Sequence, residues 1–305
     1  MDLLLVAFKA VSKILFMVCI GVIGDRIGVL NSDVCAKMTK VMHYLFTPFM
    51  IVNGFFLEYN AEKVFGLKMT LVFTVIIHAI GIVLSKIMVK RNSPSRIVEE
   101  ASIIYANCGF MGVPLGQTMF GQEGVFYMSI HASMAPLYMW TYSAVLFTGK
   151  ADKKALKNIV TNPSIWAALI GIVIYTLQIP VPEIIKSPIA SIGGCASPMA
   201  LVLAGSMISR ADLKSALKMS KTYIVCLGKL IIMPLIMMFV LKYLPGPIMA
   251  RTCGLVAAAC PCATNVQIAA QLYGNDEKTA SLFFGVSTVI SLLTIPLMVS
   301  LFGLI

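Results

Sequence analysis

The segment NCGFMGVPLGQTMFGQEG, residues 107–124, interrupts a chain that otherwise consists of a succession of apolar stretches. The flanking residues ASIIYA and VFYMSIHA suit the inside of a bilayer, yet the segment holds five glycines together with Asn107 and Pro114. A proline lacks the backbone N–H and clashes with the preceding helical turn. Free backbone groups are tolerated at membrane depth only where protein or a water-lined cavity satisfies them. The segment therefore predicts a broken membrane helix.

The composition of the chain is that of a polytopic membrane protein. Of its 305 residues, 59% are hydrophobic and 12% are charged, and the mean hydropathy is +0.90. A soluble domain carries about 25% charged residues, and the apolar excess here extends over the whole length. The first apolar run is expected to be a span, because it is too long for a signal peptide and lacks a cleavage site. The net charge of +11 lies in short loops, so it indicates membrane orientation and no nucleic-acid partner.

Hydropathy predicts ten membrane spans of about 20 residues each, which makes the fold class all-α. Alternate loops differ in charge, since one side of the membrane receives sixteen Lys and Arg residues and the other side seven. The positive-inside rule therefore places the loop at 148–161 in the cytoplasm and both termini outside, in a cell (inner) membrane. The expected spans are 3–24, 38–57, 64–88, 97–120, 124–147, 164–180, 187–208, 219–243, 247–272 and 280–303.

Three sequence matches at the same places in a five-span unit indicate two similar halves. Because five is an odd number, the second half must enter the membrane from the opposite side, which defines an inverted repeat. We expect residues 1–148 to form the first repeat, 149–161 a cytoplasmic connection and 162–305 the second repeat. The matches are Ile-Gly at 20–21 and 170–171, Thr-Pro at 47–48 with Ser-Pro at 197–198, and FGQE at 120–123 with YGND at 273–276.

Interrupted spans at matching positions of the two halves mark the binding site in many secondary transporters. The fourth span is interrupted by NCGFMGVPL, residues 107–115, and the counterpart in the ninth span is AACPCATNVQ, residues 258–267. Two half-helix N-termini, each equivalent to about half a positive charge, suit an anion. Glycine and proline also serve helix packing in membranes, but the paired placement with an Asn in both segments favours a site. The expected substrate-binding residues are Asn107, Gly109, Gly112, Pro114, Pro261, Thr264, Asn265 and Gln267.

Charged and titratable residues inside the predicted spans are few. Lys229 is the one charge far from a span end, and such a lysine either has a function or snorkels to a surface. His78 and His131 are candidates for proton coupling, although a lone histidine on a packed helix is more often structural. All thirteen Asp and Glu lie at span ends or in loops, which fits an anionic substrate. Pro48 and Pro198 are expected to be kinks that line the site.

The eight cysteines are scattered and show no secreted disulfide framework. Most fall in apolar spans, where cysteine behaves as a small hydrophobe. Cys260 and Cys262 form the one tight pair, but no further His or Cys stands at a spacing that would complete a metal site. We therefore expect no metal or other cofactor.

The sequence resembles the auxin efflux carrier family, also called the membrane transport protein family. ANCGFMGVPLGQTMFGQEG is similar to the fourth-span signature of that family, and NPSIWAALIGIVIY, CPCATNVQIAAQLYGND and STVISLLTIPL resemble it as well. The resemblance implies that spans 4 and 9 cross where they break. It also implies elevator-like movement of spans 3–5 and 8–10 against a scaffold of spans 1, 2, 6 and 7. By motif match, Asn107, Pro114 and Pro261 occupy the family's positions at this crossing.

The resemblance implies a carboxylate as the substrate. Bacterial members of the family are described as malate or malonate permeases, and plant members export auxin, an aromatic carboxylate. The short loop at 148–161 and the CATN pattern differ from the plant carriers, so a small organic anion such as malate is expected. Auxin-like efflux, or uniport driven by the membrane potential, are the alternatives. The coupling ion could be H⁺ or Na⁺, and a homodimer is plausible.

Other classes of function fit the sequence less well. An intramembrane enzyme needs a nucleophile with a base, paired aspartates or metal ligands, and neither G-x-S-x-G nor H-E-x-x-H occurs. A channel filter usually arises from symmetric rings in oligomers, whereas this chain has internal inverted symmetry. A pump is disfavoured because no nucleotide-binding loop occurs. We therefore expect a carrier and not an enzyme.

Overall fold

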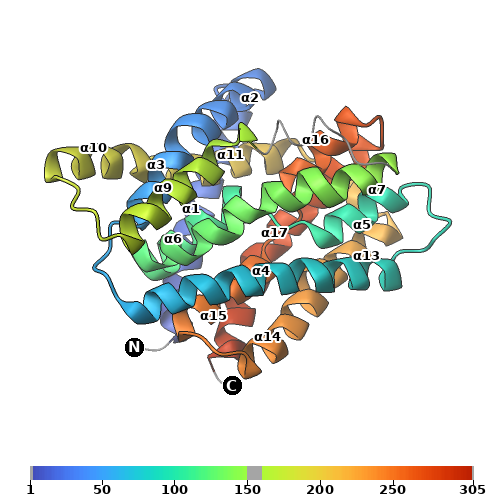
Figure 1. Cartoon of the computed structure of the whole chain (residues 1–305). Coiled ribbons are helices and arrows are strands. Elements are labelled where there is room, and N and C mark those ends of the chain that lie inside the picture. The colour runs from blue at the N-terminus through green and yellow to red at the C-terminus, as the bar shows by residue number, and fades with distance from the viewer. Residues whose placement is uncertain (1–2, 150–159, 304–305) are drawn as a thin grey trace.

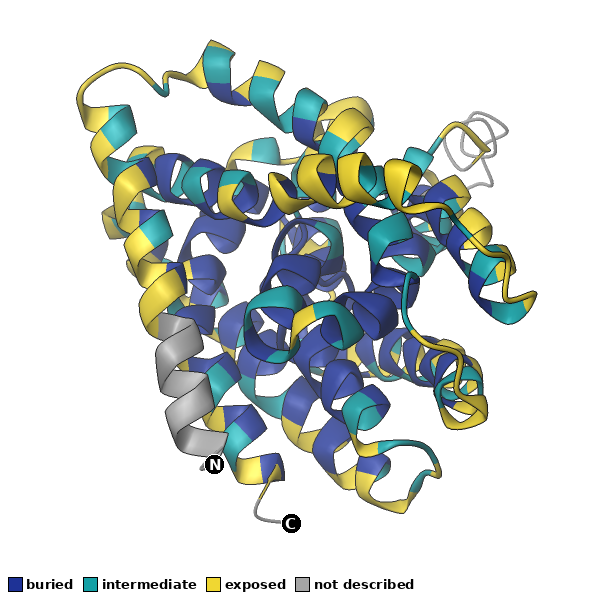
Figure 2. Ribbon diagram, turned by 90° about the vertical axis from the view of Figure 1, so that its left-hand side faces the viewer, coloured by how far each residue is buried: buried dark blue, intermediate teal, exposed yellow. Residues whose placement is uncertain are grey.

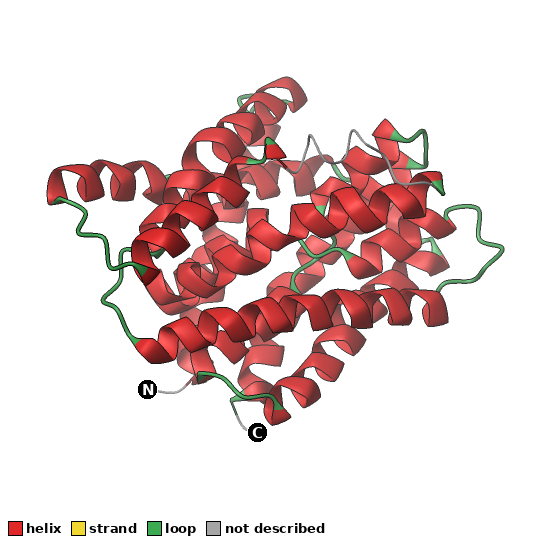
Figure 3. Ribbon diagram, in the orientation of Figure 1, coloured by secondary structure: helices red, strands yellow, loops and turns green. Residues whose placement is uncertain are grey.

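The computed structural model describes residues 3–149 and 160–303, and the regular elements of this part of the chain are helical (Figure 1, Figure 3). The connection expected at 149–161 lies mostly outside the described residues. Four elements are π-helical turns: η1 (Met42–Phe46), η2 (Cys108–Gly112), η3 (Met139–Ser143) and η4 (Gly228–Ile232). The α-helices are α1 (Leu3–Arg26), α2 (Ser32–Val41), α3 (Thr47–Gly54), α4 (Ala61–Met88), α5 (Arg96–Ile104), α6 (Val113–Tyr138), α7 (Ala144–Thr148), α9 (Pro163–Thr176), α10 (Glu183–Gly194), α11 (Ala196–Arg210), α12 (Leu213–Leu217), α13 (Ser220–Leu227), α14 (Met233–Tyr243), α15 (Ile248–Ala259), α16 (Thr264–Leu272) and α17 (Glu277–Phe302).

The helices are apolar enough for a membrane protein. Each of the ten ranges expected to span the membrane overlaps at least one helix. Helices α9 and α15 are shorter and apolar. The number of ten spans and the inverted repeat stay predictions. Within the described residues, four helical stretches are long and apolar enough to cross a bilayer: Ala61–Met88, Glu183–Arg210, Ser220–Tyr243 and Glu277–Phe302.

The outer surface carries large apolar side chains, while buried residues fill the interior (Figure 2). Ile184 is 82% exposed, Ile87 74% and Leu293 72%. In water, such an exposed apolar surface would drive association with other proteins. In a bilayer, lipid chains cover it without penalty. The start of α1 and the end of α17 lie on the same side of the molecule (Figure 1), as an even number of crossings requires. The surface therefore fits a membrane-embedded protein.

Three of the π-helical turns accommodate prolines. η1, η2 and η4 each end two residues before a proline, namely Pro48, Pro114 and Pro234. A proline cannot donate a backbone hydrogen bond, and a wider turn re-pairs the freed groups without ending the helix. The first predicted break, 107–115, was consequently too long. Pro114 lies near the start of α6, directly after η2, and between residues 105 and 115 the chain leaves helical geometry at 105–107, ahead of η2.

Helices α1 and α11 approach each other closely at two glycines. A Cβ atom on Gly21 would lie 1.9 Å from the carbonyl oxygen of Val202. A Cβ atom on Gly205 would lie 2.0 Å from the carbonyl oxygen of Val18. Small residues let membrane helices pack through their backbones, so this contact fixes α1 against α11.

Two helical hairpins turn at glycines that the expected repeat places at equivalent positions. Gly121 has φ 64° and ψ −145°, so it divides α6 into two halves, and Gly274 follows α16 with φ 67°. Both backbones lie in the region that favours glycine. The chain reverses within a few residues at each hairpin, and only a residue without Cβ does so without strain.

Replacing Gly121 with alanine is expected to destabilise the protein by about 1–3 kcal/mol, because its φ and ψ lie close to a region that only glycine adopts freely. No atom lies within 4 Å of the added Cβ, so the effect is conformational and not steric. Gly194→Ala is the matched control, since it also meets open space but has no positive φ. Thermal unfolding in detergent should show a lower Tm for Gly121→Ala alone. Equal Tm values for the two variants would contradict the conformational explanation.

Candidate functional site

The interruptions of two helices far apart in the sequence lie against each other. Residues 105–107, after α5, and 260–263, after α15, form what we call the crossover. Ala106 and Cys262 are paired there as an isolated antiparallel bridge. The structure thus confirms that the fourth and ninth expected spans are both interrupted and that the interruptions meet.

Backbone hydrogen bonds hold the crossover together. The N–H of Asn107 donates to the carbonyl of Pro261 over 2.9 Å. The N–H of Ala263 donates to the carbonyl of Tyr105 over 3.1 Å. Away from water, unpaired backbone groups cost several kcal/mol each. Each interruption therefore supplies the partners that the other one needs.

Two half-helices begin at the crossover. Asn107 is the N-cap of η2, which continues into α6, and Ala263 is the N-cap of α16. Neither N-cap side chain caps its helix, so both positive helix ends remain available to an anion. Three of the expected site residues lie in the first four positions of α16 and are half-buried: Thr264, Asn265 and Gln267.

Lys229 lies beside the crossover and does not snorkel. It belongs to η4, and its side chain is fully buried, with 0% exposure. η4 packs against α5 and α15, the two helices that lead into the crossover, and against α17. Among the described residues, its Nζ has no hydrogen-bond partner. The sequence singled out this lysine but could not place it, and the structure puts it next to both interruptions.

Asn107 contributes a second donor that lacks an acceptor. Its side chain is 4% exposed, and no described residue accepts a hydrogen bond from its Nδ2. An ammonium group and an amide NH₂ can only donate. A buried donor without an acceptor costs about 1–3 kcal/mol, and more if it is charged. Lys229 and Asn107 therefore present two unmet donors at the crossover, which an anionic oxygen acceptor would satisfy.

The buried carboxylates of the described chain do not meet this need, because they have partners elsewhere. Glu99 lies in the first turn of α5, Glu100 follows it, and each is 3% exposed. Glu99 accepts from Ser95 over 2.8 Å and lies 4.0 Å from Lys221, while Glu100 pairs with Arg96 over 2.8 Å. This cluster joins α5 to α13 at one end of the helices.

The two candidate histidines are joined through Thr74 of α4. His78 Nδ1 lies 2.8 Å from the carbonyl of Thr74, so Nδ1 carries a hydrogen. The Thr74 hydroxyl lies 2.7 Å from His131 Nδ1. The ring of His78 also stacks on Tyr138, with centroids 3.9 Å apart. These contacts fix the orientation of both histidine rings. A role of His78 and His131 in proton coupling stays a prediction.

Two of the expected glycines have different surroundings. A Cβ on Gly112 would lie 2.6 Å from Met128 Cε and 3.1 Å from Cys260 Sγ, so Gly112 allows η2 to pack against the second interruption. A Cβ on Gly109 would meet no atom within 4 Å. Gly112 therefore serves close packing, while Gly109 leaves open space beside the crossover.

Pro48 and Pro198 lie on α3 and α11, outside the helices that form the crossover. Pro48 lines an apolar groove of about 360 Å³ between α3 and α9, together with Trp166 and Ile170. Pro198 is exposed near the start of α11. The expectation that these kinks line the site stays a prediction.

Sequence reasoning assigned no role in the site to the cysteines and the serine that lie at the crossover. Cys108 Sγ donates to the carbonyl of Ala257 on α15 over 3.8 Å. The N–H of Cys262 donates to Ser287 Oγ on α17 over 3.1 Å. The available signal was the position of the cysteines inside the two interrupted motifs and of Ser287 at the start of STVISLLTIPL. In the part of the chain that the structure describes, no three His, Cys, Asp or Glu residues are placed to hold a metal.

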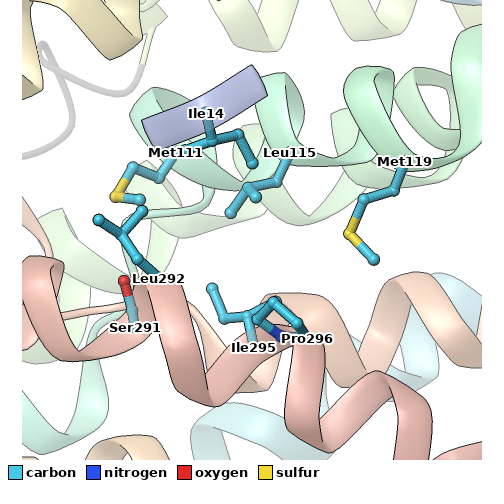
Figure 4. Close-up of a pocket in the computed structure, with 8 residues that line it drawn as sticks. All are labelled: Ile14, Met111, Leu115, Met119, Ser291, Leu292, Ile295 and Pro296. Atoms are coloured by element: carbon cyan, nitrogen blue, oxygen red, sulfur yellow. The ribbon is translucent and has the colours of Figure 1, made fainter. Parts of the chain in front are cut away.

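A small apolar cavity lies where α1, α6 and α17 pack together (Figure 4). Its volume of about 10 Å³ leaves room for at most one water molecule, and Ser291 supplies its one polar side chain. The cavity is therefore a packing gap between helices and not a substrate site. It is lined by Ile14, Met111, Leu115, Met119, Ser291, Leu292, Ile295 and Pro296.

Comparisons with known proteins agree with this arrangement. A family model described as "Membrane transport protein" matches residues 6–159 and 149–299. The chain is also 20% identical, over 304 residues, to a protein of Methanocaldococcus jannaschii named "Uncharacterized transporter MJ1031". That similarity covers 96% of this chain and 98% of the other protein. The family match includes both interruptions of the crossover.

Proposed function

Because the chain belongs to the membrane transport protein family, we propose that it is a secondary active transporter of a small organic anion, a carboxylate such as malate. The M. jannaschii relative, named a transporter, supports transport in general. The anion binds at the crossover and is exposed to the two sides of the membrane in turn. The protein acts as a carrier in the cell membrane, with both termini outside, and not as an enzyme.

The pair of unmet donors at the crossover carries the proposal. Lys229 Nζ and Asn107 Nδ2 are buried, and no described residue accepts from either. A carboxylate offers two oxygens with about four acceptor positions, which is enough acceptors for both donors. Two uncapped helix N-termini at the same place add further attraction for negative charge. A cation or an uncharged apolar substrate would leave the donors unsatisfied.

Matched packing in the two halves supports the inverted repeat. Gly21 of α1 packs on α11 beside Gly205, and Gly171 of α9 packs on α3 at the ring of Phe55. Gly171 follows Gly21 by 150 positions, and Gly205 follows Phe55 by the same number. An inverted repeat exchanges such pairs. We therefore propose two five-span repeats in which α4–α7 and α13–α17 move as an elevator against α1–α3 and α9–α11.

A polar network on α4 and α6 bears on the coupling ion. His78 and His131 are joined through Thr74 of α4, and α4 packs against η4, which holds Lys229. We therefore propose H⁺ as the coupling ion, with Na⁺ as the alternative. Auxin-like efflux and uniport driven by the membrane potential use the same donors. A channel is the remote alternative, and saturable counter-transport separates it from a carrier.

Asn107→Ala is expected to raise the half-saturation concentration for malate uptake about 10- to 100-fold, because it removes a donor to a charged acceptor. The fold should persist, since the bond of residue 107 to Pro261 is made by the backbone. The measurement is uptake of labelled malate into liposomes, with pH and sodium gradients imposed separately. Asn92→Ala, in an exposed loop, is the control.

The outcomes of this experiment separate the parts of the proposal. Wild-type saturation with a defect in Asn107→Ala supports an anion carrier with its site at the crossover, and the driving gradient identifies the coupling ion. Equal malate uptake by wild type and Asn107→Ala would mean that the binding site does not lie at the crossover. If wild-type protein takes up no malate, malate is not the substrate, and other carboxylates are tested in the same assay.

A further inference from the structure

Gln122 joins the first helical hairpin to the end of α3. Its Nε2 donates to the carbonyl of Asn53 over 2.7 Å and to the carbonyl of Phe56 over 3.0 Å. These carbonyls lie at and just after the end of α3, where the Asn53 carbonyl also accepts from the N–H of Phe56 over 3.1 Å. Gln122 directly follows the kink at Gly121. One side chain thus connects the proposed moving part to the proposed scaffold.

The second hairpin uses its matching amide differently. Asn275 follows Gly274 as Gln122 follows Gly121, and the two glycines have nearly the same φ, 67° and 64°. Asn275 Nδ2 donates over 3.2 Å to the carbonyl of Tyr273, within its own hairpin. The two amides therefore occupy equivalent positions, but in this structure one bonds across to another helix and the other bonds locally.

We propose that Gln122 is a latch that holds one of two transport states, and that Asn275 is the matching latch of the other state. The proposal rests on the proposed function, because it requires a carrier with inverted repeats. In such a carrier the two halves exchange conformations when the site changes sides. The hydrogen bonds of Gln122 exist in the state described, while those of Asn275 to the end of α11 form only after the exchange. Each amide then acts on the balance between the states and not on substrate binding.

Other hydrogen bonds also join α6 to the proposed scaffold, since Ser197 Oγ on α11 donates to Gln117 Oε1 and Ser133 Oγ donates to the carbonyl of Ser164 on α9. Glu123 lies 4.0 Å from Lys63 on α4, so this pair stays within the proposed moving part, and both side chains are partly exposed. Gln122 differs in that it makes two bonds at once, to the carbonyls of Asn53 and Phe56. Their loss should change the ratio of the two states about tenfold.

The test measures the distance between scaffold and moving part by pulsed electron spin resonance in liposomes. Spin labels are attached at Ile184→Cys on α10 and Lys68→Cys on α4, which are both exposed. Cys19 and Cys195 are exposed and are replaced with serine, whereas the other six native cysteines are buried. The variants are Gln122→Ala, Asn275→Ala and the double variant.

If the two amides are latches, Gln122→Ala and Asn275→Ala should shift the ratio of the two distance populations in opposite directions. Gln122→Ala is expected to transfer population from the main distance to a second one, about tenfold in ratio, and the double variant to return toward the wild-type ratio. An unchanged ratio in Gln122→Ala, or a double variant shifted further than the single one, would overturn the proposal. The distance measurement requires no substrate. A shifted population ratio in protein that takes up no malate would exclude malate as the substrate and support the latch. Normal malate uptake with an unchanged ratio would exclude the latch and leave the proposed function intact.

Discussion

Replacing Lys229 with methionine is expected to lower transport roughly 100-fold or more and at the same time to raise the Tm. The ammonium group is the one full charge at the crossover, and loss of a buried charge partner costs about 2–5 kcal/mol of binding. Methionine has a similar length and leaves no unmet donor, so it relieves the penalty of a buried amine that has no partner among the described residues. Labelled-malate uptake and thermal unfolding in detergent measure the two effects.

Lys242→Met is the matched control, because it removes a lysine from α14, the continuation of the same helix, at an exposed position. Its uptake should stay within about twofold of wild type, and its Tm should change little. Wild-type uptake by Lys229→Met would exclude Lys229 from the site. A large loss of stability in that variant would instead show that Lys229 is paired within the fold.

Gly205→Val is expected to prevent stable folding, with a cost of about 3 kcal/mol or more. The first added carbon already lies 2.0 Å from the carbonyl oxygen of Val18, and a backbone atom cannot rotate away. Helices α1 and α11 would have to separate, and the backbone contact between them would be lost. The fraction of monodisperse protein after detergent extraction and the Tm of that fraction measure the effect.

Gly194→Val controls for the introduction of a branched side chain, because its Cβ meets open space on α10. This variant should remain monodisperse with a Tm close to that of wild type. A stable Gly205→Val protein would mean that α1 and α11 do not approach as closely as the structure shows.

The sequence predicted both interruptions, because their signal is local. Clusters of Gly, Pro and Asn within apolar runs conflict with a continuous membrane helix, as around Asn107 and Pro261. The structure confirms the interruptions and shortens the first. Pro114 was expected in the break, but a π-helical turn ahead of it lets the helix continue. The sequence could not reveal this turn, since the residues around Pro114 are compatible both with a broken helix and with a π-helical turn.

The surroundings of Lys229 could not be predicted, because tertiary packing decides them. Lys229, Cys108 and Cys260 lie far apart in sequence, and no periodicity connects them. The same holds for the bonds of Gln122 to the end of α3. A lysine within an apolar span is unusual, so the sequence alone drew attention to Lys229. Only the fold shows that it is buried beside the crossover.

The pairing of Ala106 with Cys262 has a consequence for biosynthesis. The two residues are 156 positions apart in the chain. A ribosome that adds about 5–20 residues per second needs roughly 8–30 s to travel between them. During that time the nascent first half lies in the bilayer with its interruption unpaired. Insertion of this protein therefore passes through a stage that depends on the translocation machinery or a membrane chaperone, and the first half expressed alone should be a substrate for membrane proteases.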